Sequence, residues 1–148
     1  GDPMRPEILS AAKVEQAEYF VIATDDPDTN IKTAEVVHKL YPHIKIIARA
    51  RNRQHVHRLV DLGAEAIRET YYSSLEMSRR TLVGLGLTQA QADARIKRFK
   101  HHDEQVLEAQ HAVYDDAAKV LQTAQEARAE LARLFEADQM EEREAGKA

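Results

Sequence analysis

The sequence of 148 residues is 43% apolar and 31% charged, which suffices for one ordinary core rather than several. Its 21 basic and 25 acidic side chains give a net charge of -4, so no overall field attracts an anionic membrane, and no nucleic acid is expected as a partner. The absence of cysteine excludes disulfides and thiolate chemistry, and no apolar run approaches the ~20 residues that cross a bilayer, so the sequence predicts a soluble chain.

The first part of the chain alternates between apolar, strand-like runs and helix-like segments. We expect a helix over residues 6–12, a strand over 19–24, a helix over 30–40, a strand over 44–48, a helix over 53–62 and a short third strand at 66–67. The candidate N-caps are Asp28, Thr29 and Asn30 for the first long helix and Asn52 for the second. Pro42 ends the first of these helices, and Gly63 ends the second as a C-terminal cap. This order of elements is typical of a right-handed parallel α/β unit.

Beyond residue 71 the sequence contains only helix formers. We expect one helix from Ser73 or Ser74 to Gly84, a second that starts at Thr88, and a long helix of roughly thirty residues from Val106. In the long helix, spacings of four and three define a heptad seam formed by Val113, Ala117, Val120, Ala124, Ala127, Leu131 and Leu134. This seam fits a helix that packs on its own domain and equally one that crosses to a second subunit.

Acidic side chains follow the first predicted strand. Thr24 ends it, and Asp25, Asp26 and Asp28 form the turn after it. Parallel strands separated by one helix bring their carboxyl ends side by side, and in open α/β sheets ligands bind there. The turn therefore either contacts a ligand through Thr24 or Asp25, or serves only as solvated turn and cap chemistry.

Two arginines follow the second predicted strand. Arg49 and Arg51 occupy alternate positions, so both are expected on the same side of the chain as it leaves the sheet. Guanidinium groups bind phosphate or carboxylate through paired hydrogen bonds. The alternative is an ion pair with Asp2, Asp25 or Asp26, which is compatible with ligand binding at the same place.

Metal and catalytic motifs are missing from the sequence. The histidine pairs 55 and 57, and 101 and 102, are spaced so that neither pair shares a helix face, and no HExxH is present. There is also no nucleophile elbow, no glycine-rich phosphate loop and no isolated carboxylate pair. We therefore expect neither a metal site nor an enzyme.

Several motifs resemble the KTN or RCK (TrkA-N-like) regulatory domain of Kef-type, glutathione-regulated potassium:proton antiporters. They are the Gly1-Asp2-Pro3-Met4 start, the VIATDDPDTN strand and turn of residues 21–30, the PHIKIIARAR segment of residues 42–51, Arg68-Glu69-Thr70 and the LGL of residues 85–87. The resemblance covers residues 1–108. The family's GxGxxG phosphate loop would precede Gly1 and is not in this sequence, so phosphate binding through such a loop is not expected of this chain.

The resemblance implies an α/β fold, namely the C-terminal half of a Rossmann-like parallel sheet over residues 1–70, followed by an α-helical extension over residues 71–148 that serves dimerisation. It also implies a homodimer that binds an adenine nucleotide, AMP or NAD, and is regulated by glutathione. The partner would be a membrane-embedded antiporter domain, with this domain at the cytoplasmic face of the inner membrane.

The resemblance also assigns site residues. Gly1 and Asp2 match the turn beside the adenine, and Thr24 and Asp25 match the strand end that lines the nucleotide site. Arg68 matches the arginine that contacts glutathione. Asp103 stands where some members have a glutathione-contacting asparagine, and an aspartate there accepts hydrogen bonds but does not donate them.

The implied function is a ligand-driven switch without chemical turnover, with Asp26, Arg49 and Arg51 completing the nucleotide edge. Two alternatives stay open. One is a fragment of a small nicotinamide-dependent oxidoreductase, and the other is a helical protein-interaction module whose working part is residues 113–134.

Overall fold

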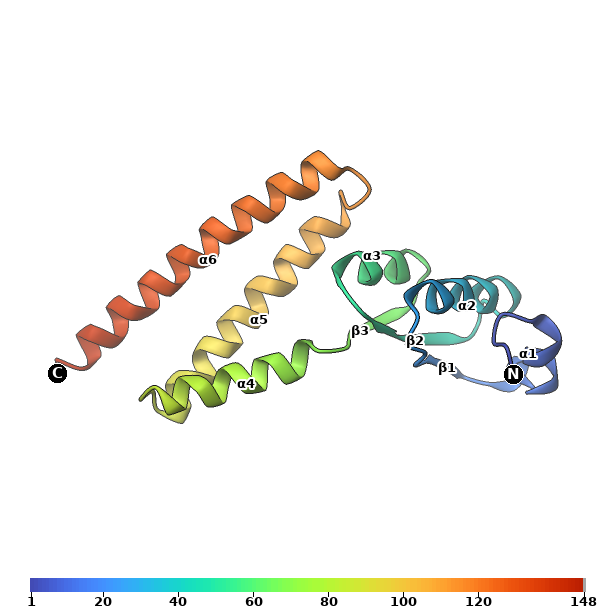
Figure 1. Cartoon of the computed structure of the whole chain (residues 1–148), viewed down its shortest axis with the longest axis horizontal. Coiled ribbons are helices and arrows are strands. Elements are labelled where there is room, and N and C mark those ends of the chain that lie inside the picture. The colour runs from blue at the N-terminus through green and yellow to red at the C-terminus, as the bar shows by residue number, and fades with distance from the viewer. Residues whose placement is uncertain (148) are drawn as a thin grey trace. The chain divides into compact units, whose positions relative to one another are not determined.

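The computed structural model describes residues 1–147, without the side chains of residues 117 and 118. The chain divides into two compact units (Figure 1), the first spanning Gly1–Tyr72 and the second beginning at Ser73. No helix within residues 1–147 is long and apolar enough to cross a membrane.

The first unit is a three-stranded parallel sheet with helices. Its elements are α1 (Pro6–Ala11), the 3-10 turn η1 (Val14–Gln16), β1 (Tyr19–Ile22), α2 (Pro27–Leu40), β2 (Lys45–Ala50), α3 (Arg53–Asp61) and β3 (Glu65–Arg68). The strand order is β1-β2-β3, with both pairs parallel. The predicted fold class is confirmed, although β1 ends two residues earlier than expected and β2 continues two residues further.

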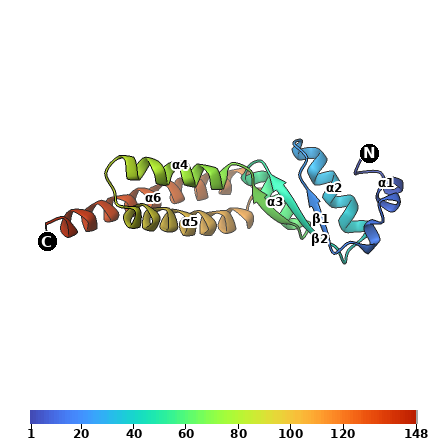
Figure 2. The same cartoon turned by 90° about the horizontal axis from the view of Figure 1, so that it is seen from below.

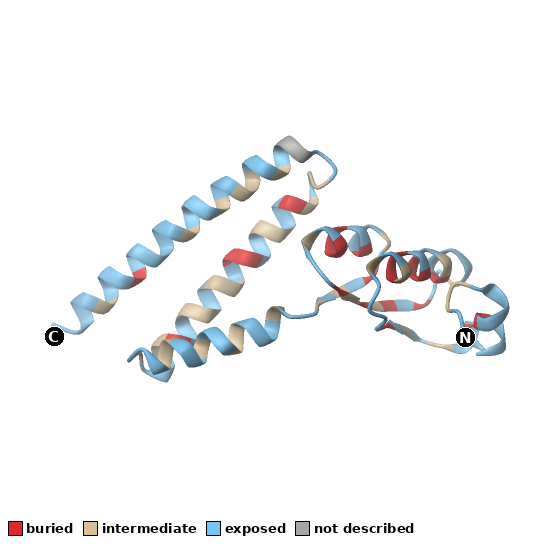
Figure 3. Cartoon of the chain, viewed as in Figure 1, coloured by how far each residue is buried: buried red, intermediate tan, exposed pale blue. Residues whose placement is uncertain are grey.

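One face of this sheet carries the core. Alternate residues of the strands, including Ile22, Ile46 and Ala48, are buried, and α2 and α3 pack together on the same side of the sheet (Figures 1 and 3). Leu59 of α3 and Val37 of α2 are the largest apolar side chains that are fully buried. On the opposite face Val21 is 66% exposed, so only one face of β1 is buried within this unit.

The ends of α2 and α3 follow from local chemistry. Asp26 caps α2, because its Oδ2 accepts a hydrogen bond from the Thr29 amide at 2.8 Å, so the expectation of a cap at residues 28–30 is wrong. Pro27 occupies the first helical position, where its missing N–H costs nothing. Asn52 caps α3 as predicted, accepting from the His55 amide at 2.9 Å. Gly63 follows α3 with φ of +73°, a left-handed conformation that glycine adopts without strain, so its predicted role is also confirmed.

From Tyr71 to residue 147 the chain is helical, with α4 (Tyr71–Gly84), which begins two residues before the second unit, α5 (Gln89–His111) and α6 (Ala117–Ala145), seen in Figure 2. Thr88 caps α5 in a capping box with Gln91, as expected of a helix start. The expectation that Ser73 or Ser74 caps the first helix is wrong, because α4 already begins at Tyr71.

The expected long helix from Val106 is also wrong. Val106 lies inside α5, and the chain turns over residues 112–116 before Asp116 caps α6 by accepting from the Lys119 amide at 3.2 Å. The reversal brings α6 back along α5. Val113 therefore lies in the turn and not in a continuous seam.

Four seam residues of α6 lie half-buried on the face toward α5: Val120, Ala124, Ala127 and Leu131. Asp138, one heptad after Leu131, pairs with Arg98 of α5, which shows that this face points inward. Of the two alternatives, the described seam therefore packs on its own unit. Leu134 is exposed, and the side chain of Ala117 lies outside the described residues.

Polar contacts dominate the pairing of α5 with α6. Arg95 Nε donates to Glu142 Oε1 at 2.7 Å, Arg98 pairs with Asp138, and His102 Nε2 lies 3.4 Å from Glu130 Oε2. Among the described residues of this unit, Ala92 is the only apolar side chain that is fully buried, whereas the buried polar ones are His102, Asp103, Gln110 and Asp138. The helical unit thus has little hydrophobic core of its own.

Candidate functional site

The carboxyl ends of the three strands meet around Arg49, the penultimate residue of β2. Its Nη1 donates to Asp25 Oδ1 at 2.9 Å and to the carbonyl oxygen of Ala23 at 3.2 Å, both just beyond β1. Its Nη2 pairs with Glu69, just beyond β3. The hydrogen bond with Glu69 is the largest of the effects that raise the pKa of Arg49. One guanidinium therefore joins all three strand ends.

Asn30 makes a second connection at the same edge. Its Nδ2 donates to the carbonyl oxygen of Arg49 at 3.0 Å, and its Oδ1 accepts from the hydroxyl of Thr24. The side chain is almost fully buried, with Asn30 only 1% exposed. Sequence reasoning considered Asn30 only as a cap, although its spacing of four and seven residues from Ala34 and Val37 places it on the buried face of α2.

The acidic turn after β1 is divided between two roles. The hydroxyl and amide of Thr29 both donate to Asp26, at 2.6 and 2.8 Å, and they are the main reason that the pKa of Asp26 is lowered. Asp26 is thus an ionised helix cap. The Asp25 side chain is 92% exposed even though it pairs with Arg49, so most of its carboxylate still faces solvent.

The two arginines of the β2 end differ in their surroundings. Arg49 is half-buried and held by the groups described above, whereas Arg51 is exposed and its positive charge helps to lower the pKa of Asp26. The backbone N–H of Arg51 donates to Nδ1 of His55, at 3.0 Å. Arg49 consequently organises the edge, and the positively charged side chain of Arg51 is exposed to solvent beside it.

The first residues of the chain form a turn ahead of α1. Asp2 Oδ1 accepts from the Met4 amide at 2.9 Å, and the Asp2 carbonyl oxygen accepts from the Arg5 amide at 3.2 Å. Gly1 lies against Ile8, where an added Cβ would come within 3.0 Å of the Ile8 side chain. No hydrogen bond found among residues 1–147 links this turn directly to Arg49.

Comparison with known proteins identifies the family. Residues 73–148 match the potassium efflux system KefB C-terminal domain, and residues 1–69 match the TrkA-N domain. A solved structure of the Shewanella denitrificans Kef CTD in AMP-bound form is 35% identical, covers 76% of this chain and 72% of that one, and superposes with a TM-score of 0.73. This chain belongs to the Kef C-terminal domains. It is a regulatory domain of a potassium efflux system, and the oxidoreductase and interaction-module alternatives are not favoured.

Of the two residues expected to bind glutathione, Arg68 lies in the first unit of this Kef domain and Asp103 in the second. The Arg68 guanidinium lies over the ring of Tyr71, 3.6 Å from the centroid, in a cation–π contact. Asp103 lies on α5 and is 4% exposed. A carboxylate buried to this extent needs polar partners within the protein, so Asp103 has a structural role.

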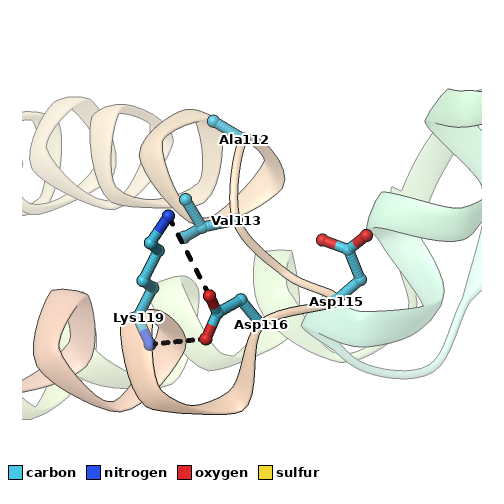
Figure 4. Close-up of a pocket in the computed structure, with 5 residues that line it drawn as sticks. All are labelled: Ala112, Val113, Asp115, Asp116 and Lys119. Carbon is cyan, nitrogen blue, oxygen red and sulfur yellow. Dashed lines mark hydrogen bonds and ion pairs between the residues drawn. The ribbon is translucent and has the colours of Figure 1, made fainter.

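A shallow hollow lies at the turn between α5 and α6 of the Kef domain (Figure 4). It is lined by Ala112, Val113, Asp115, Asp116 and Lys119, and Lys119 Nζ lies 3.9 Å from Asp116 Oδ2. Sequence reasoning missed this turn because it expected an unbroken helix there. Within residues 1–147, no group of three or more His, Asp or Glu side chains is arranged to hold a metal ion.

The Asn30 connection generates the first prediction. Replacing Asn30 with Ala leaves the buried Arg49 carbonyl and the Thr24 hydroxyl without their partner, and we expect a loss of about 2 kcal/mol in the free energy of unfolding of the first unit. Hydrogen exchange of the α2 amides measures this free energy. Lys32→Ala on the exposed face of α2 is the control and is expected to change it little. Equal effects of the two substitutions would contradict the role of Asn30.

Proposed function

We propose that this Kef domain binds an adenine nucleotide, AMP in the first instance, at the carboxyl edge of its sheet. The observation that carries the proposal is the convergence of carboxylate and guanidinium groups at that edge around Arg49. The AMP-bound form of the Shewanella denitrificans relative supports the choice of ligand. Ligands of open α/β sheets bind outside the carboxyl ends of the strands, which is where these groups lie.

Each polar group at the edge has a chemical counterpart in AMP. The exposed carboxylate of Asp25 suits the ribose hydroxyls as a hydrogen-bond acceptor, and the exposed guanidinium of Arg51 suits the phosphate. Thr24 is held by Asn30 beside them, and we place the turn of Gly1 and Asp2 at the adenine. Arg49 lies at the end of β2, and its donors already bind groups beyond β1 and β3, so it positions these groups and does not itself hold the phosphate.

Removing the positive charge of Arg51 tests this assignment. We expect Arg51→Gln to weaken AMP binding about tenfold, because a charge-assisted hydrogen bond to the phosphate is lost. Adenosine, which has no phosphate, should bind the variant and the unmodified chain alike. Titration calorimetry measures both ligands.

Lys45→Gln is the matched control for this experiment, because Lys45 begins β2 and so lies at the opposite end of the same strand. The control should leave AMP binding unchanged. A parallel loss of AMP affinity in both variants, or none in Arg51→Gln, would remove Arg51 from the phosphate site.

We further propose that glutathione regulates this domain through Arg68 of the first unit, and we treat Asp103 of the second unit as a separate candidate contact. A guanidinium such as that of Arg68 is the kind of donor that suits a glutathione carboxylate. Asp103 accepts but does not donate, so it would bind an amide or ammonium group and repel a carboxylate. Either carboxylate of glutathione is a counterpart for the Arg68 guanidinium.

The glutathione proposal predicts that Arg68→Ala weakens binding of glutathione and of its S-conjugates, since a carboxylate loses its cation. Calorimetry on the full chain measures this, with Arg5→Ala, an exposed arginine before α1, as control. Affinities that are equal for the unmodified chain and Arg68→Ala would exclude Arg68 from the site.

Regulation then requires no chemical turnover. If glutathione and a bulkier glutathione adduct favour different arrangements of the domain, the difference between their affinities sets how far the equilibrium of the antiporter moves. A difference of ~3 kcal/mol shifts a two-state balance by about a hundredfold. The partner in this proposal is a membrane-embedded cation:proton antiporter domain, and this domain acts on it from the cytoplasmic face of the inner membrane.

We also propose that the domain acts as a homodimer. The helical unit buries one apolar side chain among its described residues, while Leu121, Phe135 and Met140 of α6 are exposed. Burying such surface against a second copy would supply the hydrophobic stabilisation that the unit lacks by itself.

Sedimentation equilibrium of the full chain tests the dimer and is expected to give twice the mass of one chain. Phe135→Asp should shift the species toward one chain, because it would bury a charge in the contact. Lys97→Asp on the exposed face of α5 serves as control. A single-chain mass at all concentrations would contradict the dimer.

A further inference from the structure

We propose that His55 makes the nucleotide edge sensitive to pH, because protonation of its imidazole breaks the hydrogen bond that holds the backbone of Arg51. The consequence for AMP rests on the proposed function, whereas the local effect at Arg51 does not.

The hydrogen bonds of His55 fix its protonation state. The backbone N–H of Arg51 is a donor, so Nδ1 of His55, 3.0 Å away, accepts and carries no proton. The proton of the neutral ring is then on Nε2, a buried atom without a hydrogen-bond partner among the described residues. Binding a second proton would place an N–H group against the Arg51 N–H and leave a positive charge inside the unit, where His55 is 3% exposed.

The charges around the ring act in both directions. Arg58, one turn further along α3, disfavours the charged imidazole, and Asp28 at the start of α2 favours it. Burial is the largest effect, and together these effects lower the pKa of His55 below its ordinary value. The neutral ring and its hydrogen bond are therefore intact near neutral pH and are lost as the pH falls through the lowered pKa.

The bond to His55 belongs to a set of three at the end of β2. The Arg49 carbonyl accepts from Asn30 Nδ2 at 3.0 Å, the Ala50 carbonyl accepts from the Glu69 amide at 2.9 Å, and the Arg51 amide donates to His55. Of these three contacts, only the one with His55 depends on a side chain that gains or loses a proton. Its loss frees the backbone of Arg51, the residue that we place at the phosphate, so AMP binds less tightly.

Nuclear magnetic resonance on the full chain between pH 7.5 and 5.0 tests whether protonation of His55 breaks its hydrogen bond with the Arg51 amide. The hydrogen-exchange protection of the Arg51 amide, corrected for the intrinsic effect of pH, is expected to fall about tenfold, as the loss of one hydrogen bond would give. In His55→Asn the amide oxygen replaces Nδ1 as an acceptor and cannot be protonated, so protection should stay constant. His43→Asn removes an exposed histidine of the same unit and should behave as the unmodified chain.

Titration calorimetry over the same pH range tests whether protonation of His55 weakens AMP binding. The AMP phosphate titrates in this range too, but equally for both proteins, so the relevant quantity is the difference between the unmodified chain and His55→Asn. We expect the unmodified chain to lose about tenfold more affinity than the variant between pH 7.5 and 5.5. His43→Asn should again follow the unmodified chain.

The outcomes are distinguishable. Constant protection of the Arg51 amide in the unmodified chain, or the same fall in His55→Asn, would overturn the inference. If AMP does not bind at any pH, the proposed function fails. The exchange protection of the Arg51 amide still shows whether protonation of His55 breaks the hydrogen bond at the end of β2. If His55→Asn does not fold, the unmodified chain decides the question through two pH profiles, the exchange protection of the Arg51 amide and the chemical shifts of the His55 ring. Transitions at the same pH support the inference, and transitions at different pH values overturn it.

Discussion

In the first unit, the arrangement of the carboxyl edge of the sheet depends on one guanidinium, that of Arg49. Parallel strands connected by helices end side by side, but their last backbone groups have no further strand partner, and polar turns follow each of them. Arg49 meets this constraint by joining the Ala23 carbonyl, Asp25 and Glu69, which lie just beyond two different strands. Because its donors are used within the protein, Arg49 defines the spacing of the edge, and the proposed ligand contacts fall to its exposed neighbours.

Much of this edge could be predicted from the sequence. The apolar runs of β1 and β2 and the Asn52 and Gly63 caps rest on local preferences, so sequence alone located them. The cap of α2 was misplaced because polar residues that can cap a helix lie on both sides of Pro27. The deciding signal was Pro27 itself, which suits the first helical position and makes the preceding residue the cap. The sequence offered Asp25 as one of three acidic partners for the arginines, as the alternative to ligand binding. Glu69 was missed because it follows a strand with only a weak sequence signal.

The turn between α5 and α6 shows where sequence reasoning fails for a physical reason. No proline or glycine lies between Val106 and Asp116, so helix propensity alone favours an unbroken helix. The reversal is stabilised by pairs far apart in the chain, such as Arg95 with Glu142 and Arg98 with Asp138. Interactions of this kind leave no periodic signal at the break itself. The same polar character explains why the heptad seam packs on α5 and still leaves the unit with little hydrophobic core.

The central claim is that an anionic nucleotide binds where the three strands end. A titration of the isotopically labelled full chain with AMP, followed residue by residue through the backbone amides, tests it most directly. The account predicts that the largest chemical-shift changes cluster at residues 24–26 and 49–52, at the ends of β1 and β2. Saturable changes confined to α5 and α6, or to the amino ends of the strands, would contradict it.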